Sequence, residues 1–213
     1  MDIWLSSAYL APVQYYSKLL AGDRIIIEQN DNYVKQSYRN RCNIMAANGA
    51  MPLSIPVEHS STDKILMKDI RIAQHGNWQH MHWNTIVSAY NSTPFFEYYQ
   101  DDFYPFYHNK YSFLFDFNEG LRTLILDLLN IDDISIEYSS EYKTEFGSEE
   151  LDLREIIHPK KKWKELDSSF LSIPYYQVFS SRSGFAANMS IIDLLFNMGN
   201  ESLLVLSKTY NKE

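Results

Sequence analysis

Residues 1–28 decide the fold class, and they read MDIWLSSAYLAPVQYYSKLLAGDRIIIE. Ile3–Leu5 is a short apolar run, and Val13–Leu20 has the pattern of a helix that Gly22 is suited to end. Arg24–Glu28 is brief and rich in β-branched residues, as expected of a buried strand. A strand, a helix and a strand in this order predict an N-terminal βαβ-like unit.

Beyond this unit, strand-like and helix-like segments alternate. Strands are predicted at Leu53–Val57, Ile70–Ile72, Ile134–Tyr138 and Tyr175–Phe179. Helices are predicted at residues 77–90, from residue 94 to a stop or kink at Pro105, at residues 118–130, and after a capping box at Ser190–Asp193. The fold class is therefore α/β, and we expect a single domain over residues 1–213 with a mixed sheet and flanking helices.

Composition sets the broad class of protein. Of 213 residues, 45% are hydrophobic and 22% are charged, which is typical of a folded domain. The net charge is −8, and residues 111–158 supply the excess with 3 basic and 12 acidic groups. Such a chain lacks the basic face that general nucleic-acid binding needs. Without a basic, apolar leader or an apolar run near ~18 residues, we expect a cytoplasmic protein without a membrane span.

Aromatic residues make up 15% of the chain and are concentrated between residues 95 and 117. They fit either a core with amphipathic edges or a stacking wall for a sugar or nucleobase. Cys42 is the single cysteine, which excludes an intramolecular disulfide and a multi-cysteine zinc site. We interpret it as a packed side chain rather than a nucleophile.

The densest polar segment is Tyr33–Asn43, YVKQSYRNRCN. If it is extended, alternation places Lys35, Arg39 and Arg41 on one face. Because arginine favours planar carboxylate or phosphate partners, an anionic ligand is one interpretation. The other is a solvated strand edge. The acidic residues that could pair with the cations are Glu28, Asp31 and Glu58.

Three histidines lie in the second polar segment, His75–Trp83. On a helix, His80 and His82 lie about 160° apart, so they cannot share one metal ion, and no metal is expected. His82 falls on the apolar face and is either a core histidine or a general base. His75 precedes the helix and is freer to face a cleft.

A basic run, HPKKKWK, occupies His158–Lys164. It fits a solvated face or a counterion for the acidic segment that directly precedes it, and we favour this reading. Contact with a phosphate or a polymer is the alternative.

Three groups of segments, in chain order, carry a family resemblance. They are YVKQSYRNR (33–41) with LSIPV (53–57); HGNW (75–78) with HW (82–83), AY (89–90) and PFF (94–96); and YQVF (176–179) with GF (184–185) and NMSIIDLLFN (188–197). In these segments the chain resembles the WbqC-like family. The family often opens with His/Gln-Pro, whereas residues 7–12, SAYLAP, keep only the later proline.

The resemblance implies a protein of bacterial O-antigen (lipopolysaccharide) and surface-polysaccharide clusters, with a suggested role in transferring glycine or another amino acid. We therefore expect an aminoacyl-type transferase that acts on a sugar precursor and uses no cofactor. The hypothesis assigns an anionic donor or sugar nucleotide to Lys35, Arg39, Asn40 and Arg41, a pocket wall to Trp78 and Tyr90, and the role of base to His75 or His82.

Two other functions stay open. The chain fits a non-catalytic carbohydrate-binding or scaffold protein of a glycosylation complex, because no recognised catalytic motif accompanies the aromatic residues. It also fits a nucleotide-dependent transferase, because βαβ units often bind nucleotides at their strand ends.

Overall fold

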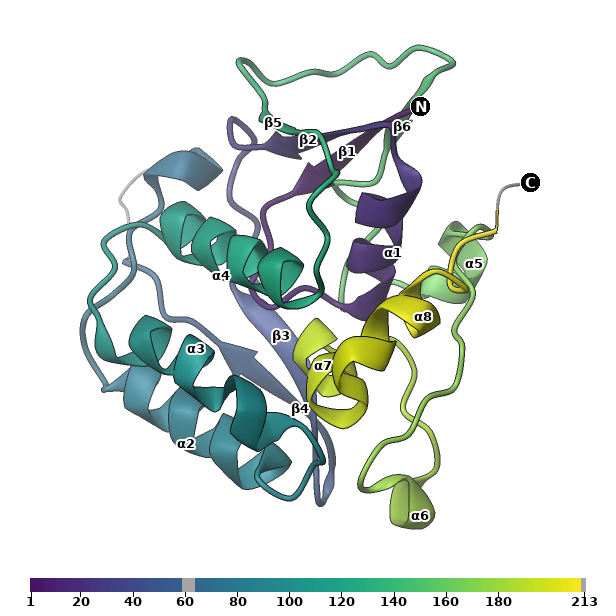
Figure 1. Ribbon diagram of the computed structural model, residues 1–213. Coiled ribbons are helices and arrows are strands. Elements are labelled where there is room, and N and C mark those ends of the chain that lie inside the picture. Colours follow the sequence, from purple (N-terminus) through teal and green to yellow (C-terminus); the bar gives the residue numbers. More distant parts are fainter. Residues whose placement is uncertain (59–63, 212–213) are drawn as a thin grey trace.

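The N-terminal βαβ unit is present in the computed structural model, which describes residues 1–58 and 64–211 (Figure 1). Strand β1 (Asp2–Ser6) is followed by helix α1 (Val13–Ala21) and strand β2 (Arg24–Glu28). The two strands are parallel, with Ile3 paired with Ile25. Parallel neighbours need a crossover connection, which α1 supplies. The predicted unit is confirmed.

A parallel sheet of four strands grows from this unit in the order β5-β2-β1-β6. Strand β5 (Ile136–Tyr138) pairs with β2, and β6 (Glu150–Asp152) pairs with β1. Strand β5 lies within the strand predicted at residues 134–138. Strand β6 was not predicted, because Glu150-Leu151-Asp152 has one apolar residue and sits in the most acidic part of the chain.

The second sheet is a hairpin of β3 (Arg41–Ala46) and β4 (Gly49–Ser54), which pairs Arg41 with Ser54. Gly49, the first residue of β4, has a φ of 110°, a conformation that glycine adopts without strain. The predicted strand Leu53–Val57 overlaps β4 only at Leu53 and Ser54, and the predicted strand Ile70–Ile72 is absent. Isolated bridges join Val57 to Ile72 and Arg71 to Phe113. The α/β class is confirmed, with parallel and antiparallel strands in separate sheets.

The predicted helices at residues 77–90 and 118–130 are confirmed, and the helix after Ser190 is present. The helical elements are η1 (Met67–Asp69), α2 (Trp78–Tyr90), α3 (Phe96–His108), α4 (Leu114–Leu128), α5 (Trp163–Leu166), α6 (Ser180–Ser183), α7 (Ile191–Met198), η2 (Gly199–Glu201) and α8 (Ser202–Leu206). Helix α3 continues past Pro105 to His108. Pro105 therefore does not end the helix, although it has no N–H to donate to the preceding turn.

Two predictions near the C-terminus were wrong. Tyr175–Phe179 forms no strand. Ser190 occupies the N-cap position of α7, but its Oγ donates to the Leu10 carbonyl at 2.7 Å instead of capping the helix. Asp193 accepts hydrogen bonds from Tyr175 and Gln177, so neither half of the capping box forms.

One hydrophobic core joins the two sheets and the helices. Helices α2 and α7 both contact β3, and α2 also packs against α3 (Figure 1). Phe196 of α7 is fully buried and meets Phe96 and Phe103 edge to face, at centroid distances of 5.1 and 5.4 Å. The buried rings between residues 95 and 117 therefore pack in the core, although Tyr98 is 76% exposed.

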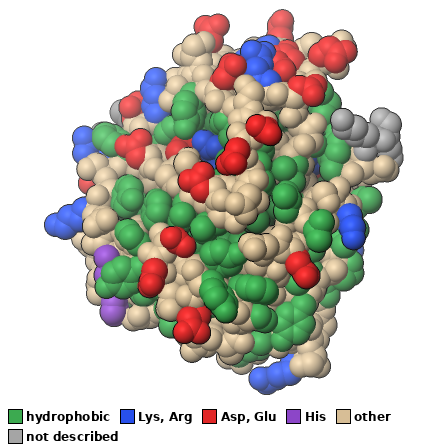
Figure 2. All heavy atoms as spheres, in the orientation of Figure 1, with side chains coloured by type: hydrophobic (Ala, Val, Ile, Leu, Met, Phe, Trp, Pro, Cys, Tyr) green, Lys and Arg blue, Asp and Glu red, His purple; other side chains and the backbone are tan. Residues whose placement is uncertain are grey.

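Acidic side chains gather at the end of the molecule that carries the β5–β6 connection (Figure 2). The connection contributes the exposed Glu141, Glu145 and Glu149. The acidic excess of residues 111–158 is thus partly concentrated there. Within the described ranges, no helix combines the length and apolar character needed to cross a membrane.

Candidate functional site

An open pocket of about 420 Å³ lies where β3 begins and β4 ends, a size suited to a small-molecule ligand. We call it the Arg41 pocket. It is lined by Tyr33, Lys35, Gln36, Asn40, Arg41, Ser54, Ile55, Pro56, Val57, Glu58, Ile65, Ile70 and His75. Four residues of the predicted site, Lys35, Asn40, Arg41 and His75, share this lining.

The segment that leads into β3 is folded differently from the extended strand considered above. Residues 35–40 form turns, and Gln36 has a φ of 59°. Ser37 Oγ donates to the Val34 carbonyl at 2.6 Å and accepts the Arg39 N–H at 3.3 Å. These local bonds compete with an extended backbone. The one-face arrangement of Lys35, Arg39 and Arg41 was therefore wrong.

Because of these turns, the Arg39 side chain lies in the interior and does not line the Arg41 pocket. Its side chain is 3% exposed and forms an ion pair with the equally buried Asp31. A second ion pair, at 2.8 Å, joins Arg39 to Glu155, whose side chain is 54% exposed. Asp31 is thus confirmed as a structural partner for a cation of this segment.

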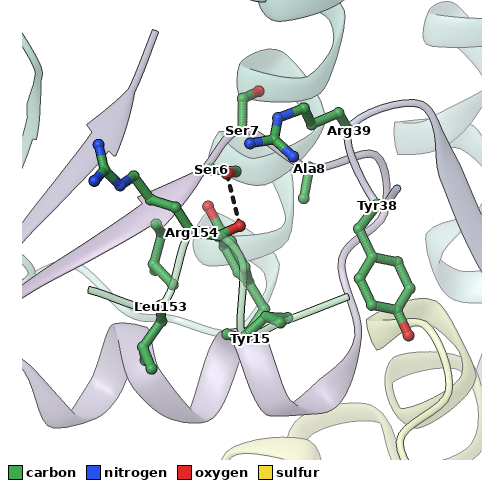
Figure 3. A pocket seen from close by; sticks show the side chains of 10 residues that line it. Ser6, Ser7, Ala8, Tyr15, Tyr38, Arg39, Leu153 and Arg154 are labelled. Atoms are coloured by element: carbon green, nitrogen blue, oxygen red, sulfur yellow. Dashed lines mark hydrogen bonds between the residues drawn. The ribbon is translucent and has the colours of Figure 1, made fainter. Parts of the chain in front are cut away.

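Arg39 lines a small cavity at the carboxyl ends of β1 and β6 (Figure 3). Ser6 and Arg154 lie on its wall, and Ser6 Oγ donates to the Arg154 carbonyl at 3.0 Å. The Arg154 side chain is held by Glu28 at 2.7 Å, with both side chains buried. The cavity has a volume of about 10 Å³, enough for roughly one water molecule. This cavity is too small for a nucleotide.

Arg41 and Asn40 are oriented by the hairpin. Arg41 Nε donates to Ser54 Oγ at 3.0 Å, which leaves its terminal nitrogens available to a ligand. Asn40 Nδ2 donates to the Ile55 carbonyl at 2.9 Å, while its buried Oδ1 has no hydrogen-bond partner among the described residues. Lys35 is exposed and forms no ion pair within residues 1–58 and 64–211. The pocket therefore offers two cations, and Asn40 forms part of its wall.

His75 is the histidine that lines the pocket. It is exposed and lies directly before the left-handed Gly76 and Asn77, which have φ values of 78° and 49°. The chain reverses at these two residues and then enters α2 at Trp78. His75 is thus held at the rim, as its position before the helix predicted.

His82 is a core histidine. It is 5% exposed, and its Nδ1 lies 3.0 Å from the Tyr9 hydroxyl, which in turn is 2.9 Å from the Tyr107 hydroxyl. Burial lowers the pKa of His82 to about 4, and a backbone hydrogen bond with Ser54 offsets part of this effect. The ring is neutral at pH 7, and its hydrogen bond with the backbone of Ser54 links it to a lining residue of the pocket.

His82 should make folding stability pH-dependent. Its folded pKa, about 4, lies below its ordinary value of 6.5, so protonation favours the unfolded chain. The contribution is complete above pH ~6.5 and is lost as the pH falls through about 4, with a loss of about 2.5 kcal/mol by pH ~4.5. We expect urea titrations at pH 7 and 4.5 to show this loss in the wild type and not in His82→Gln. Equal pH dependence in the two proteins would contradict the assignment.

Trp78 and Tyr90 do not line the Arg41 pocket. Trp78 packs edge-on against His82 and Phe117, at centroid distances of 5.2 and 5.5 Å. The Tyr90 hydroxyl accepts the Met45 N–H and donates to Asp193 Oδ1, both at 3.1 Å. Both residues are buried and belong to the hydrophobic core.

Four polar residues of the pocket lining were not in the predicted site; they are Tyr33, Gln36, Ser54 and Glu58. Glu58 was considered only as a structural counterion. The turn that joins the strands is Ala47-Asn48, because Ala46 pairs with Gly49, and this register places Ser54 opposite Arg41. A turn at Asn48-Gly49 would instead place Pro56 opposite Arg41, so the sequence did not reveal Ser54 as the partner.

A match to a family model establishes the protein family to which the chain belongs. The model described as the WbqC-like protein family matches residues 7–162. The chain belongs to the WbqC-like family. The matched residues include the complete lining of the Arg41 pocket and the buried Arg39–Asp31 pair. No curated protein and no solved structure matches the chain.

Proposed function

We propose that this WbqC-like protein acts in the assembly of a bacterial surface polysaccharide such as O-antigen. In this proposal the Arg41 pocket binds an anionic acyl donor or sugar nucleotide. The observation that carries it is the presence of Lys35 and Arg41 in one pocket, where neither forms an ion pair with a described residue. Ammonium and guanidinium groups placed in this way favour a phosphate or carboxylate.

The polar groups of the pocket have complementary roles in this proposal. Lys35 supplies a point charge, and the terminal nitrogens of Arg41 supply a planar pair of donors. Asn40 Oδ1 accepts a hydrogen bond from the ligand, which removes the cost of a buried oxygen without a partner. Arg39, His82, Trp78 and Tyr90 hold the walls in place and make no contact with the ligand.

The reaction we propose is aminoacyl transfer. An amine or hydroxyl of the sugar precursor attacks the carbonyl carbon of the activated donor. A new amide or ester bond forms, and the bond between the acyl carbon and its leaving group breaks. His75 accepts the proton lost by the nucleophile, and the leaving group departs with the bonding electron pair. Glu58, on the same lining, is a second candidate for the proton acceptor.

The Arg41 pocket is tested by calorimetric titration of the purified protein with a panel of nucleoside-diphosphate sugars. We expect Lys35→Ala and Arg41→Ala each to weaken binding by about 1.5–3 kcal/mol, or roughly 10- to 100-fold, because each removes a charged hydrogen bond. Lys208→Ala, an exposed lysine outside the pocket, is the matched control. Unchanged affinity in both pocket variants, with native circular dichroism, would refute the assignment.

Turnover separates the enzyme from a non-catalytic carbohydrate-binding or scaffold protein. Incubation with aminoacyl donors and a sugar precursor that binds should yield an aminoacylated sugar, detected by mass spectrometry. His75→Ala should lose product while it retains binding. Saturable binding without product at any donor would favour the scaffold.

A further inference from the structure

A second groove, of about 380 Å³, lies beside the basic run predicted at residues 158–164. We call it the lysine groove. It is lined by Tyr38, Asn43, His158, Pro159, Lys161, Lys162, Trp163, Lys164, Glu165, Ala187, Asn188 and Met189. None of these residues lines the Arg41 pocket, although both sites draw on the segment Tyr33–Asn43. The two sites are therefore separate, with this segment shared between their walls.

The three lysines of the groove lining form no ion pair with a buried acidic side chain in the described part of the chain. Lys161 Nζ donates to the Glu155 carbonyl at 2.6 Å, a neutral acceptor. Lys162 meets Glu165 at 3.0 Å, with side chains 77% and 65% exposed, and such surface pairs are weak. Lys164 Nζ lies 5.4 Å from the centre of the Trp163 ring. Glu165 is the one carboxylate among the described lining residues, so the lining is net positive.

His158 adds a donor to this wall. Its Nδ1 accepts the Lys160 N–H at 3.1 Å, so the neutral ring carries its proton on Nε2. Burial is the main effect that lowers the pKa of His158; the charge of Glu155 opposes it, and the smaller effects of Lys161, Arg39 and Lys160 add to the lowering. His158 thus presents a ring N–H donor beside the lysines of the groove.

The groove also has an aromatic and an amide surface. Trp163 is partly exposed and is fixed by an edge-to-face contact with Phe170 at 5.0 Å. Asn43 enters the lining from β3, within the hairpin that also presents Arg41 to the other pocket. Lys160 Nζ donates a hydrogen bond to Gln36 Oε1. Since Gln36 lines the Arg41 pocket, this bond connects the basic run to that pocket.

We propose that the lysine groove is a second ligand site, which binds a diphosphate group that carries an attached ring. Lys161, Lys162 and Lys164 provide three ammonium groups, which match the several oxygens of a diphosphate. The Trp163 face covers the attached ring, since indole provides a flat apolar surface. The volume suits a ligand of this size.

The first test uses the full-length, ¹⁵N-labelled protein and inorganic pyrophosphate. The chain has four tryptophans, whose indole N–H signals report separately on their surroundings. We expect the Trp163 signal to shift saturably. Trp4, Trp78 and Trp83 are buried outside the groove, so their signals should move little. A saturable shift confined to other signals, or no shift at millimolar pyrophosphate, would overturn the proposal.

The second test compares two double variants by calorimetry. Lys162→Ala/Lys164→Ala should weaken pyrophosphate binding by about tenfold or more, because two charged contacts are lost. Lys110→Ala/Lys208→Ala removes the same net charge at exposed positions outside both sites and should bind as the wild type does. Equal losses in the two variants would mean a general charge effect and would overturn the proposal.

The Arg41 pocket is tested separately in the same assay. If pyrophosphate binding is lost in Lys35→Ala/Arg41→Ala and unchanged in Lys162→Ala/Lys164→Ala, the anion site is the Arg41 pocket and the lysine groove is refuted. The source of the diphosphate follows from two further probes. A soluble nucleoside diphosphate and phosphatidylcholine vesicles that contain a polyprenyl diphosphate distinguish a free nucleotide from a lipid-linked saccharide.

Discussion

Replacing Arg39 with alanine should lower the free energy of unfolding by about 3–5 kcal/mol. The substitution leaves the Asp31 carboxylate buried without its guanidinium partner, and it also removes the bond to Glu155. A buried charge without a partner costs far more than an intact pair contributes. Urea denaturation followed by circular dichroism measures the change.

Glu155→Ala is the matched control for this prediction. The Glu155 side chain is 54% exposed, so its loss should change stability by less than about 1 kcal/mol. If Arg39→Ala unfolds at the same urea concentration as the wild type, the buried pair does not stabilise the fold. Arg39 would then again be a candidate ligand-binding residue, as the sequence predicted.

Replacing Asp193 with alanine should cost about 3 kcal/mol of stability. Its carboxylate accepts hydrogen bonds from Tyr90 at 3.1 Å and from Tyr175 and Gln177 at 2.7 Å. Asp193 is 1% exposed, so these donors have no water to replace it. Burial raises the pKa of Asp193, and the three donors act against that rise. Thermal and urea unfolding measure the loss.

Tyr90→Phe isolates one donor of this network and should cost only about 1–2 kcal/mol. It keeps the ring against Phe196 and removes the hydroxyl that joins Met45 to Asp193. Ligand binding should stay close to that of the wild type. A large loss of binding in a stable Tyr90→Phe protein would show that Tyr90 contacts the ligand directly.

Local patterns predicted the frame of the fold because they coincide with its strongest elements. Strands β1 and β2 are continuous apolar runs, as parallel strands buried on both faces should be. Strand β6 shows no such run, since its place in the sheet comes from pairing with β1 rather than from its own apolar residues. Tyr175–Phe179 alternates like a strand, yet the Tyr175 and Gln177 side chains donate to Asp193 and the Val178 N–H donates to Asn197 Oδ1.

The candidate site was predicted in part. The structure brings Lys35, Asn40, Arg41 and His75 to one pocket, and it places Arg39 in the interior. The Asp31 partner of Arg39 is eight residues away, whereas Glu155 is 116 residues away and could not be inferred from spacing. A segment that looks like one cationic face therefore divides between a buried ion pair and an open pocket.

The most direct test of the central claim is the composition of surface polysaccharide in a strain that lacks the gene and carries Lys35→Ala/Arg41→Ala. The wild-type gene should restore an aminoacyl substituent on the polysaccharide, detected by mass spectrometry. The double variant, accumulated to the wild-type level and folded, should fail to restore it. Wild-type composition in that strain would contradict the assignment of the Arg41 pocket as the functional site.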